Sequence, residues 1–261
     1  MADKKKTVGR VLDVCKLSDG IYDMKIKTEL SRDAKPGQFV GVFTKDSKNL
    51  LPRPISICEA DKDEETLRLV FRTCGEGTRE FATYKKEDEV ELLGVLGNGF
   101  PIEKACGKSV MVMGGGIGIP PIVELSKKLS EMGITPAAVV GYRDSETFLK
   151  TDLEKYAKVY IATADGSVGA KGTVMDAVAL NNISCDVIFA CGPMPMLKAI
   201  KDYAHKTGIK AYISLEERMA CGVGACLGCV TKTVNVDHHS HVNNARICTD
   251  GPVFDADEVD I

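Results

Sequence analysis

The chain has 261 residues, of which 44% are apolar and 27% are charged, a composition typical of an ordinary globular protein. Its formal charge of −3 gives no reason to expect binding to nucleic acid or to an anionic membrane. No apolar run approaches the roughly 18 residues that a membrane span needs, and no apolar segment of a secretory signal follows the basic start Lys4–Lys6. We therefore expect a cytoplasmic protein.

The pattern of residues 1–101 predicts an antiparallel β domain. Short runs rich in β-branched and aromatic residues alternate with turn signals such as Ser-Asp-Gly and Lys-Pro-Gly, and this spacing is typical of a small barrel. The turn Gly97–Pro101 breaks the pattern and predicts a domain boundary. The expected strands are Thr7–Val14, Ile21–Lys27, Gln38–Phe43, Ile55–Glu59, Leu67–Arg72 and Glu89–Leu93.

Two motifs in this first domain are suited to a phosphate-bearing cofactor. In Leu51–Ser56, prolines on both sides fix the backbone of Arg53, whose guanidinium can grip a phosphate, and Ser56 can offer its hydroxyl to a planar ring. In Gly75–Thr78, backbone N–H groups and a hydroxyl stand at the start of a short helix. Taken alone, the first motif fits a proline-limited edge strand equally well, and the second fits an ordinary helix N-cap.

Residues 102–214 alternate between short apolar strands and helices with 3.6-residue spacing, which predicts a doubly wound parallel α/β domain. The expected strands are Val110–Met113, Ala137–Val140, Val159–Ala162, Val187–Ala190 and, as the last one, Ala211–Ser214. The expected helices are Ile122–Met132, Phe148–Tyr156, Val174–Leu180 and Met194–Thr207.

Two glycine-containing turns lie at strand ends of this α/β domain. Gly114–Pro121 follows a strand and opens a helix, a placement suited to an anion, although it is not the strict dinucleotide fingerprint G-x-G-x-x-G. Cys191-Gly192-Pro193 follows a later strand. Without further context the glycine run is as consistent with a structural turn, and Cys191 is better interpreted as a small buried residue.

Residues 215–261 are rich in glycine and cysteine and have little periodicity, so we expect a small module that depends on its metal to fold. Cys221, Cys226, Cys229 and Cys248 have the C-x4-C-x2-C…C spacing of plant-type [2Fe–2S] ligands. The alternatives are structural zinc, which usually pairs two short C-x2–4-C knuckles, and four inert buried thiols.

The other candidates in the chain carry less information. Cys15, Cys58, Cys74, Cys106 and Cys185 are predicted to be buried reduced thiols. His238, His239 and His241 lie in a polar stretch that favours a solvated loop over a metal site. Phe254, in an otherwise acidic tail, is a candidate contact for a partner protein.

Arg53-Pro54-Ile55-Ser56 together with Gly75-Glu76-Gly77-Thr78 resembles the FAD-binding barrel of the ferredoxin–NADP reductase superfamily, and the glycine run and Cys191-Gly192-Pro193 resemble its nicotinamide-binding turns. The resemblance implies that Ser56 lies near the reactive nitrogen of the flavin and Cys191 beside the nicotinamide, where both serve catalysis. The implied FAD contacts are Arg53, Pro54, Ile55, Ser56, Val70, Phe71, Arg72, Gly77 and Thr78. The implied NAD(H) contacts are Gly115, Gly116, Gly118, Pro121, Gly192 and Pro193.

With a [2Fe–2S] module after the FAD and nicotinamide domains, the order of modules predicts electron transfer to or from another protein. Ser214–Cys226 and Cys248–Phe254 closely resemble the corresponding segments of the electron-transfer subunits of dihydroorotate dehydrogenase B. The resemblance extends over essentially the whole chain. That family implies an FMN-containing catalytic partner in a heterotetramer of two copies of each subunit, in pyrimidine biosynthesis, with electrons leaving for NAD+. The competing interpretation is an NAD(P)H-linked reductase subunit that serves ferredoxin, a hydrogenase or another flavoprotein. The residues after the second α/β strand, Arg143 and Asp144, leave NADH and NADPH undecided.

Overall fold

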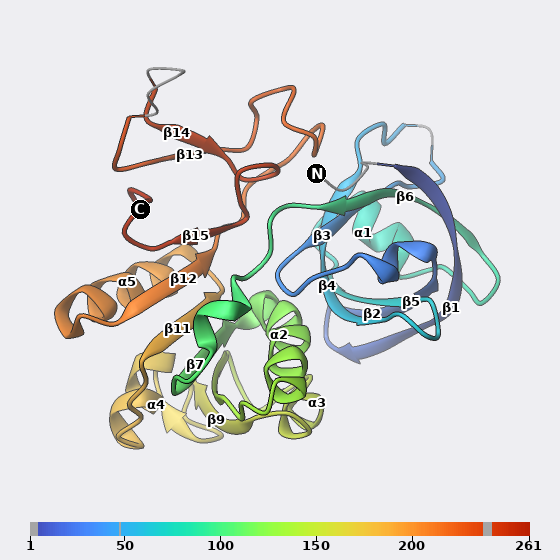
Figure 1. Ribbon diagram of the computed structural model, residues 1–261. Coiled ribbons are helices and arrows are strands. Elements are labelled where there is room, and N and C mark those ends of the chain that lie inside the picture. The colour runs from blue at the N-terminus through green and yellow to red at the C-terminus, as the bar shows by residue number, and fades with distance from the viewer. Residues whose placement is uncertain (1–4, 47, 237–241) are drawn as a thin grey trace.

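The computed structural model describes residues 5–46, 48–236 and 242–261, and the predicted histidine loop at His238, His239 and His241 lies outside them. A β-barrel and an α/β unit stand side by side, and the C-terminal segment lies next to both (Figure 1). In the described part of the chain no helix is long and apolar enough to cross a membrane.

The N-terminal part is a closed antiparallel barrel, as predicted, with strand order β1-β2-β5-β4-β3-β6. Its core is formed by the inward-facing residues of these strands, among them Met24, Ile57 and Leu69, which are fully buried. The short helix α1 (Glu76–Phe81) closes one end of the barrel. The strands are β1 (Lys6–Ser18), β2 (Ile21–Lys27), β3 (Phe39–Val42), β4 (Arg53–Asp61), β5 (Thr66–Arg72) and β6 (Glu89–Leu96).

The second part is a sheet in the order β10-β9-β8-β7-β11-β12-β15, parallel except at β15. Side chains alternate across it, so Met111 and Met113 pack under α4 and α5, while Val110 and Val112 pack under α2 and α3. This two-sided cover confirms the predicted doubly wound fold. The elements are β7 (Val110–Gly115), α2 (Ile119–Glu131), β8 (Ala137–Tyr142), α3 (Lys150–Glu154), β9 (Lys158–Thr163), β10 (Ala170–Lys171), α4 (Val174–Leu180), β11 (Val187–Cys191), α5 (Met194–Thr207) and β12 (Lys210–Ser214).

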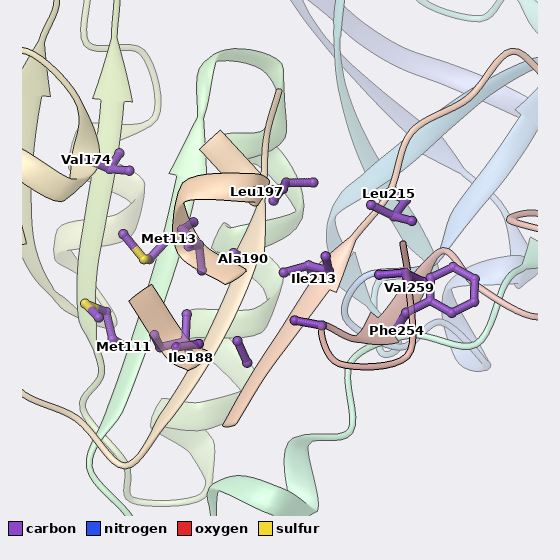
Figure 2. Packing of buried hydrophobic residues seen from close by; sticks show 14 of the residues in the cluster. Met111, Met113, Val174, Ile188, Ala190, Leu197, Ile213, Leu215, Phe254 and Val259 are labelled. Carbon is purple, nitrogen blue, oxygen red and sulfur yellow. The ribbon is translucent and has the colours of Figure 1, made fainter. Parts of the chain in front are cut away.

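The prediction that Ala211–Ser214 is the last strand was wrong. The chain continues through the hairpin of β13 (Val230–Lys232) and β14 (Asn244–Arg246) to β15 (Val253–Asp255), which pairs antiparallel with β12. Phe254 on β15 is only 7% exposed and packs with Ile213, Leu215 and Val259 (Figure 2). It is therefore a core residue, and the prediction of a partner contact at this position was wrong.

The prediction of five buried thiols was correct for Cys58 alone. Cys185 is partly buried, and Cys15, Cys74 and Cys106 are exposed. Cys15 lies on the solvent side of β1, and Cys106 ends the turn after Ala105, because the local strand and turn geometry, rather than the residue type, decides burial.

Polar groups join the barrel to helices α2 and α3 of the α/β unit. Arg68 of β5 lies 2.7 Å from Asp23, 2.6 Å from Glu59 and 3.3 Å from Asp152 of α3. Glu124 of α2 is fully buried, and its Oε2 accepts a hydrogen bond of 3.0 Å from the backbone N–H of Ala60 on β4. Among the described residues its Oε1 has no hydrogen-bond partner, and the Lys128 ammonium is 4.0 Å away.

We expect Glu124→Gln to stabilise the protein at pH 8 but not at pH 5. Burial raises the pKa of this carboxyl from 4.5 to about 7, against the opposing effects of the Ala60 N–H, Lys127 and Lys128, and with a small contribution from Glu59. Between these two pKa values the folded state binds more protons than the unfolded state, so stability falls as the pH rises, by up to about 3 kcal/mol. Melting temperatures of both proteins at pH 5 and pH 8 measure the difference. Glu131→Gln, on the exposed side of the same helix, is the control, and an effect of Glu124→Gln that is equal at both pH values would contradict the assignment.

Candidate functional site

A cleft of about 940 Å³ lies where the barrel, the first α/β loop and the C-terminal segment meet. This volume is in the range of small-molecule and cofactor sites. The barrel contributes every predicted FAD residue except Gly77, the α/β unit contributes Ile117, and the C-terminal side contributes Ser214–Met219 and Pro252. The lining residues from the barrel are Phe39, Lys48–Ser56, Val70, Phe71, Arg72, Cys74 and Thr78.

Arg53 lies at the start of β4, directly over the N-terminus of α1. Its guanidinium donates hydrogen bonds to Asn49 Oδ1, at 2.8 Å, and to the carbonyl of Leu51. A Cβ at Gly77 would stand 2.5 Å from Arg53 Nε, so only glycine lets the arginine lie this close to the helix. Thr78 Oγ1 accepts hydrogen bonds from the N–H groups of Cys74, at 3.0 Å, and Gly75, at 3.2 Å, and thereby orders the turn. A cationic fork and a helix N-terminus thus face one cleft, as a diphosphate requires.

The cleft wall beyond Arg53 comes from β4 and β5. Ser56 is partly exposed on β4, where it pairs with Phe39 of β3, and it lines the cleft. Phe71 on β5 is 2% exposed, and its ring packs edge-on against Phe81 at 5.9 Å between centroids. Phe71 is therefore mainly a core residue, with one side in the cleft wall. The exposed Arg72 follows it, and its Nη2 would stand 3.4 Å from a Cβ at Gly116 of the α/β unit.

The two glycine-containing turns of the α/β unit are in direct contact. β7 ends at Gly115, a single turn of 3-10 helix spans Gly116–Gly118, and α2 begins at Ile119 with prolines in its first turn. A Cβ at Gly118 would stand 2.4 Å from the carbonyl oxygen of Cys191. A Cβ at Gly115 would stand 3.0 Å from Pro193 Cδ, and one at Gly192 would stand 2.6 Å from Met196 Cε. Gly118 is therefore required for the close approach of the two backbones, whereas Gly115 and Gly192 leave room for the side chains of Pro193 and Met196.

Cys191 ends β11 and is only 1% exposed. Its register partners are Gly114 on β7 and Ser214 on β12. Burial raises the pKa of its thiol, the negative charge of Glu216 adds to this effect, and a hydrogen bond with Ser214 opposes it. Cys191 is thus a neutral thiol, and the described cleft lining includes Ser214 rather than Cys191.

The four cysteines of the C-terminal segment lie in two pairs. Cys221 interacts with Cys226, and Cys248 interacts most strongly with Cys229 and more weakly with the charge of Cys221. Backbone N–H groups also point at sulfur: Val223 N lies 3.4 Å from Cys221 Sγ, and Gly228 N lies 3.4 Å from Cys226 Sγ. Burial raises the pKa of Cys221, but the backbone N–H groups of Val223, Cys226 and Ala225, together with the Cys226 thiol, outweigh burial and lower the pKa to about 6.

The four cysteines supply the donor set of a two-iron cluster. A [2Fe–2S] cluster needs two thiolates on each of two irons, and the contacts of Cys221 with Cys226 and of Cys229 with Cys248 fit this requirement. Cys229 and Cys248 are buried, whereas Cys226 is exposed. One side of the cysteine group therefore faces the protein core and the other faces solvent.

Several residues of the cleft lining were not predicted as cofactor contacts, and Ile117 and Glu216 are two of them. Ile117 brings the α/β unit to the flavin side of the cleft, and Glu216 lies across from Arg72. The Glu216 side chain is exposed to the cleft, but surrounding protein atoms hold bulk water away, so desolvation raises the pKa of its carboxyl and Arg72 opposes the shift. In the sequence, Glu216 stands in the charged run Glu216–Arg218 before the cluster cysteines, which favours solvated charges or a docking face over a cofactor contact.

Comparison with known proteins bears on the C-terminal segment and on the chain as a whole. Residues 216–260 match the family model of the iron–sulfur cluster binding domain of dihydroorotate dehydrogenase B. A dihydroorotate dehydrogenase B (NAD(+)) electron transfer subunit from Bacillus velezensis is 42% identical over 93% of this chain and 94% of its own length. One from Listeria welshimeri is 39% identical over 98% of this chain and 99% of its own length.

Among solved structures, an NADH-dependent reduced ferredoxin-NADP oxidoreductase has a TM-score of 0.83 and 27% identity over 97% of this chain and 90% of its own. A ferredoxin NADP+ reductase from Neisseria gonorrhoeae with bound FAD and NADP has a TM-score of 0.66 and 17% identity over 83% of this chain and 95% of its own, which is a likeness of fold. The identity of about 40% to the subunits above, over nearly the full length of both chains, decides the family. This chain belongs to the electron transfer subunits of NAD(+)-linked dihydroorotate dehydrogenase B.

Proposed function

We propose that this chain carries electrons from an FMN-containing dihydroorotate dehydrogenase catalytic subunit to NAD+, with FAD and a [2Fe–2S] cluster as its own cofactors. The oxidation of dihydroorotate to orotate releases two electrons, and NAD+ accepts two as a hydride. A flavin supplies the exchange between paired electrons and the single electrons of the cluster. The observation that carries the proposal is the one cleft shared by the barrel, the nicotinamide loop and the segment that leads to the cysteines.

On the flavin side, Arg53 and the N-terminus of α1, with Gly77 and Thr78, hold the FAD diphosphate. Pro54, Ile55, Ser56, Val70, Phe71 and Arg72 form the wall against which the ring system packs, and Ser56 offers the polar contact nearest the reactive part of the ring. All of these residues except Gly77 line the cleft. Gly77 acts through Arg53, because it leaves room for the guanidinium.

On the nicotinamide side, Gly115, Gly116, Gly118 and Pro121 form the diphosphate turn, while Cys191, Gly192 and Pro193 lie beside the nicotinamide. The contact between the two turns supports this proposal, because it brings both of them to one side of the nicotinamide nucleotide. Cys191 is a neutral thiol buried at the base of this turn. We assign the barrel to residues 1–101, the nicotinamide domain to residues 102–214 and the cluster module to residues 215–261.

On the cluster side, Cys221, Cys226, Cys229 and Cys248 bind the two irons. The solvent-facing edge of this group carries apolar side chains, with Leu227 61% exposed and Val230 40% exposed. Such side chains next to an exposed ligand are suited to a protein partner, and the partner here is the catalytic subunit, in a heterotetramer of two copies of each. We place the complex in the cytoplasm, in pyrimidine biosynthesis.

Anaerobically purified protein is expected to show flavin absorption bands together with the broad red-brown absorbance of a cluster. Mixed with the catalytic subunit, it is expected to reduce NAD+ when dihydroorotate is added, whereas either subunit alone does not. The readout is NADH absorbance, with dihydroorotate omitted as the control. Co-purification with a ferredoxin or hydrogenase in place of the catalytic subunit would favour the competing reductase function, and a colourless protein that contains zinc would overturn electron transfer altogether.

A further inference from the structure

The turn that leaves the barrel is held against the segment that follows the last cluster ligand. Asn98 lies in this turn, between β6 and β7. Its backbone N–H donates to the carbonyl of Gly251 at 2.8 Å. Its side-chain Nδ2 donates to the carbonyls of Asp250, at 3.0 Å, and Val253, at 2.8 Å, and its Oδ1 accepts from the Val253 N–H at 3.2 Å. One side chain thus satisfies three backbone groups of a segment more than 150 residues away in sequence.

The turn is fixed in the same way to the strand that carries Ser56. Gln38, which is 7% exposed, donates from Nε2 to the carbonyl of Gly97 at 2.7 Å. Its own backbone carbonyl accepts from the N–H of Ile57, the residue after Ser56, at 3.0 Å. Consecutive hydrogen bonds therefore link the flavin-facing part of β4 to Gly97, and the next residue, Asn98, continues to the C-terminal segment.

On the other side of this contact, a tight turn carries Cys248. The N–H groups of Thr249, Asp250 and Gly251 all point at the carbonyl of Arg246, at 3.1, 2.7 and 3.2 Å. The Arg246 guanidinium holds the Asp250 carboxylate with two bonds of 3.1 Å. Cys248 therefore has little freedom relative to Asp250, whose carbonyl is held by Asn98.

The turn at Gly97 and the segment at Pro252 are closely packed against each other. A Cβ at Gly97, where φ is +80°, would stand 2.4 Å from Pro252 Cδ. Pro252 also lines the cleft assigned to the flavin, so the segment held by Asn98 forms part of the flavin site itself. Further back along the chain, Gly222 of the cysteine loop has Leu96 of β6 within reach of a Cβ, at 3.3 Å.

We propose that Asn98 is a positioning residue that holds the Cys248 turn in register with the flavin barrel and so sets the separation and orientation of the cluster relative to FAD. This inference rests on the proposed function. The rate of electron transfer between two centres falls steeply as their separation grows, and small errors of placement are costly where reacting groups must be held in position. Asn98 touches neither cofactor, so its effect is exerted through the backbone of residues 250–253.

The test compares Asn98→Ala and Asn98→Asp with the wild-type holoprotein. Alanine removes the three side-chain hydrogen bonds. Aspartate keeps the shape of the side chain but replaces the N–H donor with an oxygen that cannot donate to the carbonyls of Asp250 and Val253. After rapid mixing with NADH under anaerobic conditions, we expect FAD reduction at the wild-type rate in all three proteins. Subsequent reduction of the cluster, followed by its absorbance and its electron paramagnetic resonance signal, is expected to slow at least about tenfold in both variants, at unchanged iron content.

Hydrogen exchange gives a readout that does not depend on electron transfer. We expect the amide of Val253, and that of Leu215, which donates to the Pro252 carbonyl at 2.9 Å, to exchange faster in both variants. Gly97→Ala, which displaces Pro252, is likewise expected to slow cluster reduction and to speed the exchange of these amides. Gly133→Ala is its matched control, because Gly133 has a φ of +79° but no atom within 4 Å of an added Cβ, so it carries the same backbone strain without the collision.

Wild-type rates of cluster reduction in Asn98→Ala and Asn98→Asp would overturn the inference, and so would equal slowing in Gly97→Ala and Gly133→Ala. A wild-type protein whose cluster is not reduced after FAD would instead overturn the proposed function. The two failures are therefore distinguishable.

Discussion

Replacing Cys226 with serine is expected to abolish the [2Fe–2S] cluster while FAD stays bound. The variant removes one thiolate from the Cys221 and Cys226 pair and leaves one iron with an incomplete set of sulfur ligands. The residues assigned to the FAD diphosphate, Arg53 and Thr78, belong to the barrel. The main core of the barrel contains no residue of the cysteine segment, and only Phe39 and Leu96 at the edge of the barrel share a core cluster with Cys229 and Cys248. Flavin reduction by NADH should therefore persist, and electron exchange with the catalytic subunit should fall to background.

Iron and sulfide analysis, the visible spectrum and electron paramagnetic resonance of the reduced protein measure this outcome. Cys106→Ser is the matched control, because Cys106 is also an exposed cysteine but lies in the turn between the barrel and β7. Loss of both cofactors in Cys226→Ser would show that the barrel depends on the cluster module, against the division into domains proposed above.

Arg53→Ala is expected to weaken FAD binding by about 10- to 100-fold, since hydrogen bonds to a charged group contribute about 1.5–3 kcal/mol. Gly77→Ala should have a similar effect although it removes no charge. Its added Cβ would stand 2.5 Å from Arg53 Nε and displace the guanidinium. Titration of the apoprotein with FAD, followed by flavin fluorescence, gives the dissociation constants.

Arg79→Ala is the control for both variants, because Arg79 is an exposed arginine on the same helix that does not line the described cleft. If Arg79→Ala weakened FAD binding as much as Arg53→Ala does, the loss of affinity would be explained by net charge alone. FAD binding of Gly77→Ala at the wild-type level would contradict the role of Gly77 in placing Arg53.

The regular elements could be predicted because each one carries its own periodic pattern. The bounds of β2, α4 and α5 are those expected from the sequence, and α2 begins three residues earlier than predicted because Pro120 and Pro121 are tolerated in its first turn. The strands β10 and β15 are two and three residues long, too short to show a period of two. They exist because neighbouring strands offer hydrogen bonds, which is information that the local sequence does not contain.

The site residues likewise fall into those that a local motif reveals and those that depend on contacts between distant segments. Motifs whose glycines, prolines and cysteines act locally, such as Arg53 with its flanking prolines, could be found from the sequence. Glu216, Ile117 and Asn98 could not, because their environments depend on segments that meet only in the folded chain. The burial of Cys191 and Phe254 likewise depends on the strands stacked around them.

The register of β12 and β15 has a consequence for how such a chain can be built. Ser214 pairs with Val253, so the peptide leaves the sheet and re-enters it at adjacent positions. Residues 215–252 thus have the topology of an insertion between two neighbouring strands. Because the ends of the insertion are adjacent, closing this loop costs little conformational entropy. Replacing residues 215–252 by a tight hairpin turn would leave the reductase scaffold continuous. Conversely, inserting such a segment between two antiparallel edge strands of a reductase without a cluster would give a hydride-transfer enzyme a centre that passes on single electrons.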